Sequence, residues 1–176
     1  MSELRYLSIE QALLRAAILF STVGLSILLN WTAEQGAFNF WTVLLPLGLG
    51  VLTMIFPQAP WTPVLMVYAV VVWTVVNDDL ATAGSLLAAA LLLIIHTSAA
   101  LASAVPLAAS PPSGLWVRYA GRCAAVLGIT TLVWMAVRVF TGTTVPGGVV
   151  ALMLATVLIA AAVLGYERWV NRTTTA

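Results

Sequence analysis

The chain has 176 residues, of which 62% are hydrophobic and only 7% are charged, and its formal net charge is +1. A soluble domain carries about 25% charged residues, so this composition excludes a water-facing globular protein. The small net charge argues against nucleic acid as a partner, because phosphate backbones are bound by basic surfaces. The only cysteine, Cys123, leaves no internal disulfide and no multi-cysteine metal site. We expect Cys123 to fill a packing role at a helix end.

Apolar blocks follow one another along the chain, separated by short turn-forming segments. They cover residues 12–31, 38–56, 61–76, 81–105, 119–140 and 145–166. A helix needs about 20 apolar residues to cross a hydrocarbon core of about 30 Å, and all but the third block approach this length. The third rises only about 24 Å at about 1.5 Å per residue, so it must recruit residues 57–60 or thin the bilayer locally. The sequence predicts an all-α, polytopic transmembrane helical bundle in which consecutive helices are antiparallel neighbours.

The basic residues, all of them arginines, predict the orientation. With a cytoplasmic N-terminus and six crossings, only Arg138 lies outside, and the inner side carries Arg5, Arg15, Arg118, Arg122, Arg168 and Arg172. This is the distribution that the positive-inside rule expects. Tryptophans form belts at membrane interfaces, with Trp31, Trp41 and Trp73 at the outer boundary and Trp61, Trp116 and Trp169 at the inner one. We therefore predict six spans, both termini in the cytoplasm, and a bacterial plasma membrane.

His96 is the only histidine and lies within the fourth block. Its expected helical face carries the small residues Ala89, Ala99 and Ser103, which suits close helix packing. An ionisable group inside a bilayer is by default a functional candidate. Two hypotheses stay open: a neutral, hydrogen-bonded packing histidine, or a role with a proton, a quinone or a cofactor. A single histidine with no buried carboxylate nearby predicts neither a metal site nor a bound cofactor.

Asp78 and Asp79 are adjacent carboxylates in the turn between the third and fourth blocks. They could cap the next helix, where a carboxylate complements the helix dipole, or they could bind a cation. Arg138, on the same side of the membrane, could extend to the headgroups or pair with one of these aspartates.

Pro46 lies near the middle of the second block, followed by Gly48 and Gly50. Proline removes a backbone hydrogen bond, so we expect an interrupted helix. Such interruptions build substrate sites in some transporters, but a plain kink is the other interpretation. The Thr and Ser positions form no continuous stripe along a helical face, which argues against a pore.

The fourth block and the loop after it carry a resemblance. The segment Leu92 to Ala100 around His96, the pair Val105-Pro106, and the two arginines Arg118 and Arg122 resemble small, uncharacterised polytopic membrane proteins of mycobacteria and their relatives, which are encoded beside MoxR-type AAA ATPases. The resemblance implies an accessory or assembly role and carries over no catalytic residue.

No enzyme motif is present in the sequence: there is no phosphate-binding loop and no His/Asp/Ser constellation. We therefore expect a non-catalytic integral membrane subunit, or an accessory protein, of a larger membrane complex. Its partners would be membrane lipids and other membrane or cytoplasmic subunits. Arg118, Arg122, Arg168 and Arg172 are candidates for cytoplasmic docking or lipid binding. The alternative is a small oligomeric transporter or channel that uses Pro46, His96 and the aspartate pair.

Overall fold

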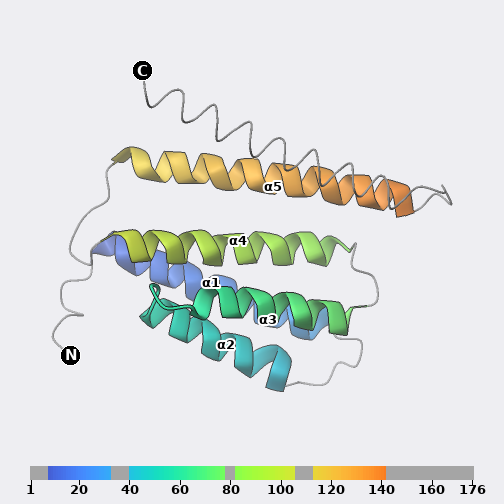
Figure 1. Cartoon of the computed structure of the whole chain (residues 1–176), viewed down its shortest axis with the longest axis horizontal. Helices are drawn as coiled ribbons and strands as arrows, with labels where there is room; N and C mark the ends of the chain where they lie inside the picture. Colours follow the sequence, from blue (N-terminus) through green and yellow to red (C-terminus); the bar gives the residue numbers. More distant parts are fainter. Residues whose placement is uncertain (1–7, 33–39, 78–81, 106–112, 142–176) are drawn as a thin grey trace. The chain divides into compact units, whose positions relative to one another are not determined.

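The structure is a computed structural model, and it describes residues 8–32, 40–77, 82–105 and 113–141. The described part of the chain is all helical apart from its turns (Figure 1). Its helices are α1 (Ile9–Thr32), α2 (Phe40–Ile55), α3 (Trp61–Val76), α4 (Ala83–Ala104) and α5 (Ser113–Thr141). The predicted helical bundle is confirmed in this respect. The sixth block, residues 145–166, lies outside the described residues, as do Arg5, Arg168, Trp169 and Arg172.

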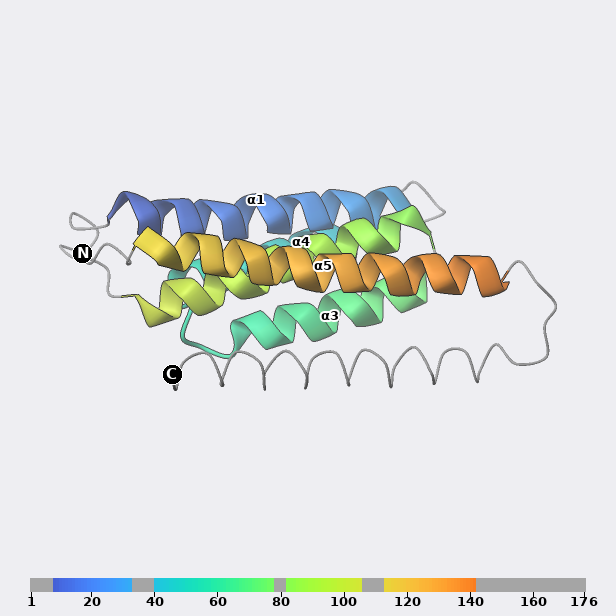
Figure 2. The same cartoon turned by 90° about the horizontal axis from the view of Figure 1, so that it is seen from above.

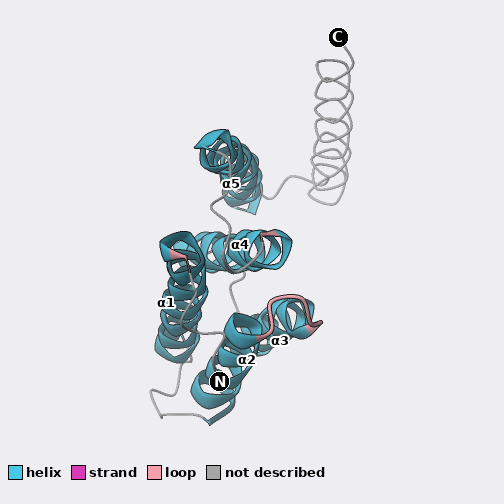
Figure 3. Cartoon of the chain, turned by 90° about the vertical axis from the view of Figure 1, so that its left-hand side faces the viewer, coloured by secondary structure: helices cyan, strands magenta, loops and turns pink. Residues whose placement is uncertain are grey.

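Four of the helices form a compact arrangement in which neighbours run in opposite directions (Figures 1 and 2). Seen along the helices, α1 lies between α4 and α2, and α3 lies beside α2 (Figure 3). The most extensive packing is between α1 and α4, followed by α1 with α2 and α2 with α3, whereas α3 and α4 touch only slightly. Consecutive helices are antiparallel neighbours, as predicted, for α1 with α2 and for α2 with α3. The main pair, α1 and α4, is however not consecutive in the chain.

The chain divides into two compact units, residues 1–125 and 126–176, and the boundary falls inside α5. The first unit contains two apolar clusters. The larger one joins α1, α3 and α4 through buried side chains, among them Leu25, Leu65, Trp73 and Ile95. The smaller cluster lies where α1 begins and α4 ends. It consists of Leu14, Leu101 and Ala102, against which Leu115 and Tyr119 of α5 pack.

Three of the described helices are long and apolar enough to cross a membrane: α1, α4 and α5. The other two, α2 and α3, have 16 residues each and rise about 24 Å, short of a core of about 30 Å. The second block was predicted to be longer than this. Residues 57–60 form a turn rather than an added helical turn, so they do not lengthen α3. The hairpin of α2 and α3 is thus a short element within the bundle.

One sequence expectation about a single side chain is wrong. Helix α5 begins at Ser113, six residues before the predicted start at residue 119, so Cys123 lies well inside a helix rather than at its end. Trp73 is 8% exposed and belongs to the larger core cluster, whereas Trp31 is 85% exposed. The ring of Trp31 is therefore open, whereas the ring of Trp73 packs inside the protein.

Candidate functional site

The faces along which α1 and α2 pack carry more polar side chains than the apolar composition of the chain suggests. From α1 they take Thr22, Ser26 and Asn30, each four residues from the next and so on one helical face. From α2 they take the buried residues Thr42, Pro46, Gly50 and Thr53, which repeat at the same helical spacing. We call these residues the α1–α2 polar seam. On α1 the seam takes two hydroxyl residues and one amide, whereas the sequence analysis considered Thr and Ser positions alone.

Close backbone approach brings the two helices together at Gly50. A Cβ atom added to Gly50 would lie 2.4 Å from Cγ2 of Thr22 and 2.7 Å from its Oγ1. These separations are too short for any side chain larger than hydrogen, so Gly50 is required by packing. Small residues at such crossings are the usual means by which membrane helices approach.

Hydroxyl groups of the seam bond mainly to their own helix. Thr22 Oγ1 donates to the carbonyl oxygen of Ile18 at 2.7 Å, and Ser26 Oγ donates to that of Thr22 at 2.9 Å. This pattern satisfies a buried hydroxyl without a partner helix. Thr42 Oγ1 reaches across to Asn30 Oδ1 at 3.5 Å. Thr53 Oγ1, in contrast, is buried and has no hydrogen-bond partner among the described residues.

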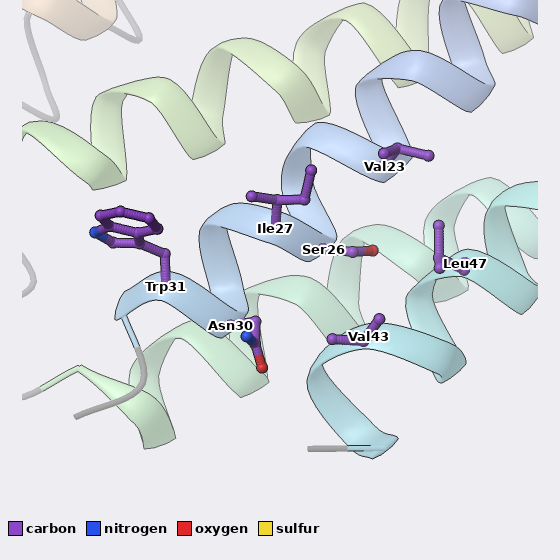
Figure 4. Close-up of a pocket in the computed structure, with 7 residues that line it drawn as sticks. All are labelled: Val23, Ser26, Ile27, Asn30, Trp31, Val43 and Leu47. Atoms are coloured by element: carbon purple, nitrogen blue, oxygen red, sulfur yellow. The ribbon is translucent and has the colours of Figure 1, made fainter. Parts of the chain in front are cut away.

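A cavity of about 270 Å³ lies beside the seam, between α1 and α2. Ser26 and Asn30 point from α1 toward α2, and Val43 and Leu47 of α2 form the opposite wall (Figure 4). Trp31 forms part of the lining and is turned away from α2 (Figure 4). The polar groups here are neutral, so the site can donate and accept hydrogen bonds but offers no acid–base group of its own.

Pro46, a predicted site residue, does not interrupt α2. The helix runs without a break from Phe40 to Ile55, and Pro46 is a fully buried member of its inner face. Membrane helices tolerate proline because neighbouring helices and hydroxyl groups compensate for the missing backbone bond. The predicted broken helix is therefore wrong, and Pro46 acts here as a packing residue of the seam.

His96 is exposed on α4, one residue from the fully buried Ile95. On the helical face predicted for His96, Ala99 is buried but Ser103 is exposed. Only part of this face therefore packs against other helices. No hydrogen bond of the His96 ring is found among the described residues, and the expectation of a packed, hydrogen-bonded histidine is not met there. The reason is register: α4 packs against α1 through residues such as Ala88, Ile95 and Ala102, which places His96 on the outer side.

The charged candidates are spread over the chain. Arg118 and Arg122 lie one turn apart on α5, as predicted, and both are exposed. The Arg122 guanidinium carbon lies 6.0 Å from the ring centre of Tyr119, within the range of a cation–π contact. Arg138 lies in the same manner over Trp134, at 5.9 Å. Asp78 and Asp79 lie outside the described residues.

A buried polar contact that the sequence analysis missed ties α1 to the end of α4. Gln11 is fully buried, and its Nε2 donates to the carbonyl oxygens of Val105 at 2.7 Å and Ala102 at 3.3 Å. The last carbonyl groups of a helix have no partner within it, so Gln11 caps α4 from another helix. The sequence did contain a signal: the amide side chain of Gln11 directly precedes the first apolar block and lies four residues before Arg15.

No protein-family model matches this chain, and the comparisons with curated proteins and with solved structures find no match either. The arrangement therefore has to be interpreted from its own geometry. Two features stand out for function: the α1–α2 polar seam with its adjoining cavity, and the open surface of α5.

Proposed function

We propose that this chain is a non-catalytic integral membrane subunit, or an accessory protein, of a larger membrane complex. The observation that carries the proposal is the surface of α5. No side chain from Gly114 to Ala125 is buried, although the helix is long and apolar enough to cross a membrane. A helix with this much open apolar surface is available to pack against another protein.

The open surface has a defined face. Gly114 and Gly121 are seven residues apart, and a Cβ atom added to either would meet no atom of the described residues within 4 Å. At about 100° per residue, Tyr119 lies nearly opposite Gly121 on the helix. Since Tyr119 packs toward Leu14, Leu101 and Ala102, the glycine face of α5 is turned away from that cluster. Glycines of this kind allow a partner helix to approach closely.

A photo-crosslinking experiment tests this proposal. A photoreactive amino acid replaces Gly121 in one variant and Val126, on a different face of the same helix, in a control. Expression in native membranes, followed by purification in mild detergent and mass spectrometry, identifies any crosslinked chain. We expect a stoichiometric partner crosslinked through position 121 and much less through position 126. Equal labelling of lipid alone from both positions would contradict the proposal.

The six-span topology, the cytoplasmic termini and the bacterial plasma membrane are part of the same proposal. The arginine distribution supports them. This support does not depend on whether the short α2–α3 hairpin crosses the membrane. Adding or removing two consecutive crossings leaves the direction in which α4 crosses unchanged. Single cysteines introduced on a Cys123→Ala background test it. We expect labelling from outside at Gly36 and Asn77 and none at Ser113, and the opposite pattern would refute the orientation.

The inner arginines support a docking role for the same subunit. Arg118 and Arg122 are exposed one turn apart, where each would contribute about 1 kcal/mol of attraction to an anionic leaflet. If they also dock a cytoplasmic partner, replacing both by Gln should release that partner while topology is retained. Equal recovery of the partner from wild-type and double-mutant membranes would leave them as membrane anchors.

A small oligomeric transporter or channel is the second candidate, and the α1–α2 polar seam favours it. Ser26 and Asn30 line a cavity of about 270 Å³, and hydroxyl and amide oxygens are suitable ligands for a polar solute. The mass of the purified complex separates the two candidates. A homo-oligomer without any other chain would favour transport, and a hetero-complex would favour the subunit.

A further inference from the structure

Arg15 is a charged side chain within α1, a helix that is long and apolar enough to cross a membrane. It is the seventh residue of the helix and is partly buried. Its Nε atom is buried and has no hydrogen-bond partner in the described part of the chain. The terminal nitrogens Nη1 and Nη2 are not among the buried atoms, so the end of the guanidinium is open. Charged side chains within spans are costly and mark functional positions, so the surroundings of Arg15 are informative.

The described residues offer Arg15 no carboxylate on its own side of the helix. Glu10 is the only acidic residue among them, and it lies five residues before Arg15. At about 100° per residue, the two side chains are therefore about 140° apart around α1. Gln11, one turn before Arg15, donates to the carbonyl oxygens of Ala102 and Val105, and its Oε1 is buried without a donor from the described residues. An anion that pairs with Arg15 thus comes from outside this part of the chain.

The helix register places Arg15 beyond the end of the α1–α2 polar seam. Arg15 is seven residues before Thr22, so the two lie about 20° apart on one face of α1. Thr22 meets α2 at Gly50, and α1 and α2 run in opposite directions (Figures 1 and 2). Seven residues beyond Gly50 the chain has already left α2, which ends at Ile55. Arg15 is therefore level with this helix end, on the inner side in the proposed orientation, and arginine side chains near helix ends reach the membrane interface.

We propose that Arg15 binds the phosphate group of one phospholipid from the inner leaflet, with Nη1 and Nη2 as the donors. Because Nε is buried against the protein, the guanidinium presents its two terminal nitrogens as a fork. Such a fork matches two oxygens of a phosphate group. Arg118 and Arg122, by contrast, are exposed and attract the leaflet without this restraint. The proposal rests on the proposed membrane embedding and orientation and is independent of any protein partner.

The test compares two lipids with the same acyl chains, phosphatidylglycerol and a monogalactosyl diacylglycerol, which has no phosphate. The full chain is reconstituted in nanodiscs that contain both lipids in equal amounts, and native mass spectrometry measures the lipid retained during delipidation. Hydrogen bonds from a charged group should favour the retention of phosphatidylglycerol about tenfold or more. Equal retention of the two lipids by the wild-type chain would overturn the proposal without requiring any variant.

Two substitutions and one control locate the site. Arg15→Gln removes both the charge and the fork, so it should abolish most of the preference for phosphatidylglycerol. Arg15→Lys keeps the charge without the fork, so it should keep only part of the preference, and full retention would refute the forked contact. Arg138→Gln makes the same change of charge at an exposed arginine that lies over Trp134 and should have little effect. A loss in this control as large as that in Arg15→Gln would assign the preference to net charge.

The same preparations separate a lipid from a soluble phosphate and this inference from the proposed function. Excess inorganic phosphate during delipidation should leave the retention of phosphatidylglycerol unchanged, because the acyl chains also hold the lipid. Complete displacement would assign the site to a soluble oxyanion and overturn the assignment to a lipid. Failure of the chain to enter nanodiscs would contradict the membrane proposal itself, whereas normal incorporation without a lipid preference would contradict the Arg15 site alone.

Discussion

Helices α1 and α5 are both long and apolar enough to cross a membrane, yet they are used in opposite ways. In the apolar 18-residue segment of α1, 39% of the residues are buried within the protein, whereas none is buried in the corresponding segment of α5. Gly24 of α1 faces Leu91 of α4 at 3.5 Å, measured from an added Cβ atom, whereas the corresponding space at Gly121 of α5 is open. The difference shows that hydropathy reports suitability for lipid and says little about which helix forms the core.

Polar residues distinguish the two helices better than apolar ones. Helix α1 buries Gln11, Thr22 and Ser26 against its neighbours, whereas Thr130 and Thr131 of α5 are only partly buried. In both helices the Thr and Ser hydroxyl groups bond to carbonyl groups one turn earlier. In a lipid environment apolar contact does not by itself select a partner, so packing and hydrogen bonds decide association. Predictions that separate the two helices therefore concern glycines and polar groups.

The largest expected effect is at Gly50. Replacement by Ala places a methyl group 2.4 Å from Thr22 Cγ2, and Thr22 is β-branched and cannot rotate away freely. We expect a loss of about 1–3 kcal/mol, typical of overpacking, and a lower melting temperature in detergent. Thr22→Ala in the same chain should restore part of the loss, because it removes the two closest atoms.

Gly48→Ala is the matched control for this prediction. It lies on the same helix, and an added Cβ atom there meets nothing within 4 Å. Alanine is favoured over glycine in a helix by up to about 1 kcal/mol, so Gly48→Ala should leave stability unchanged or raise it. Equal destabilisation by the two substitutions would mean that the close approach of α1 and α2 at Gly50 is not a feature of the folded protein.

The next effect concerns the buried amide that holds α1 to α4. Gln11→Leu removes the donor to the carbonyl oxygens of Ala102 and Val105 and leaves them unpaired. We expect a loss of about 1–3 kcal/mol in stability, measured as thermal or denaturant unfolding in detergent. Gln58 is exposed in the turn between α2 and α3, so Gln58→Leu should have almost no effect. A similar loss in both variants would argue against this cap.

A smaller and opposite effect is expected at Thr53. Its Oγ1 is buried and has no partner in the described part of the chain, and Val has nearly the same shape without the hydroxyl group. Thr53→Val should therefore stabilise the chain by about 1 kcal/mol. Thr22→Val removes a hydroxyl group that donates to Ile18 and should give no such gain. Destabilisation by Thr53→Val would show that this hydroxyl group has a partner in the folded protein.

The smallest effect on stability is expected at Gly121 of α5. Since an added methyl group meets nothing within 4 Å, Gly121→Ala should change the melting temperature of the isolated chain little, with a gain of at most about 1 kcal/mol from helix propensity. The informative measurement is the comparison with Gly50→Ala under the same conditions. A loss at Gly121 as large as that at Gly50 would show that α5 already packs through its glycine face in the isolated chain.

Most helix positions, and the suitability of each helix for a bilayer, follow from the amino-acid sequence. The third block, residues 61–76, matches α3 at both ends, and the helix bounds at 9–32 and 83–104 differ from prediction by a few residues. Long apolar runs separated by turn residues leave a chain in lipid little alternative to helices, because backbone groups must be paired internally. The start of α5 was missed because Pro111 and Pro112 made the following residues resemble a loop.

Which helix faces contact each other depends on the three-dimensional packing. In the structure, α1 packs mainly against α4, and Thr22 contacts α2 at Gly50. Trp73 is buried and His96 is exposed. In a soluble helix the apolar stripe marks the buried face, but here almost every face is apolar and that signal is lost. The spacing of Thr22, Ser26 and Asn30 was visible in the sequence, yet its partner surface on α2 is set by side-chain shape at the crossing. That complementarity depends on three-dimensional packing, which is why it appears only in the structure.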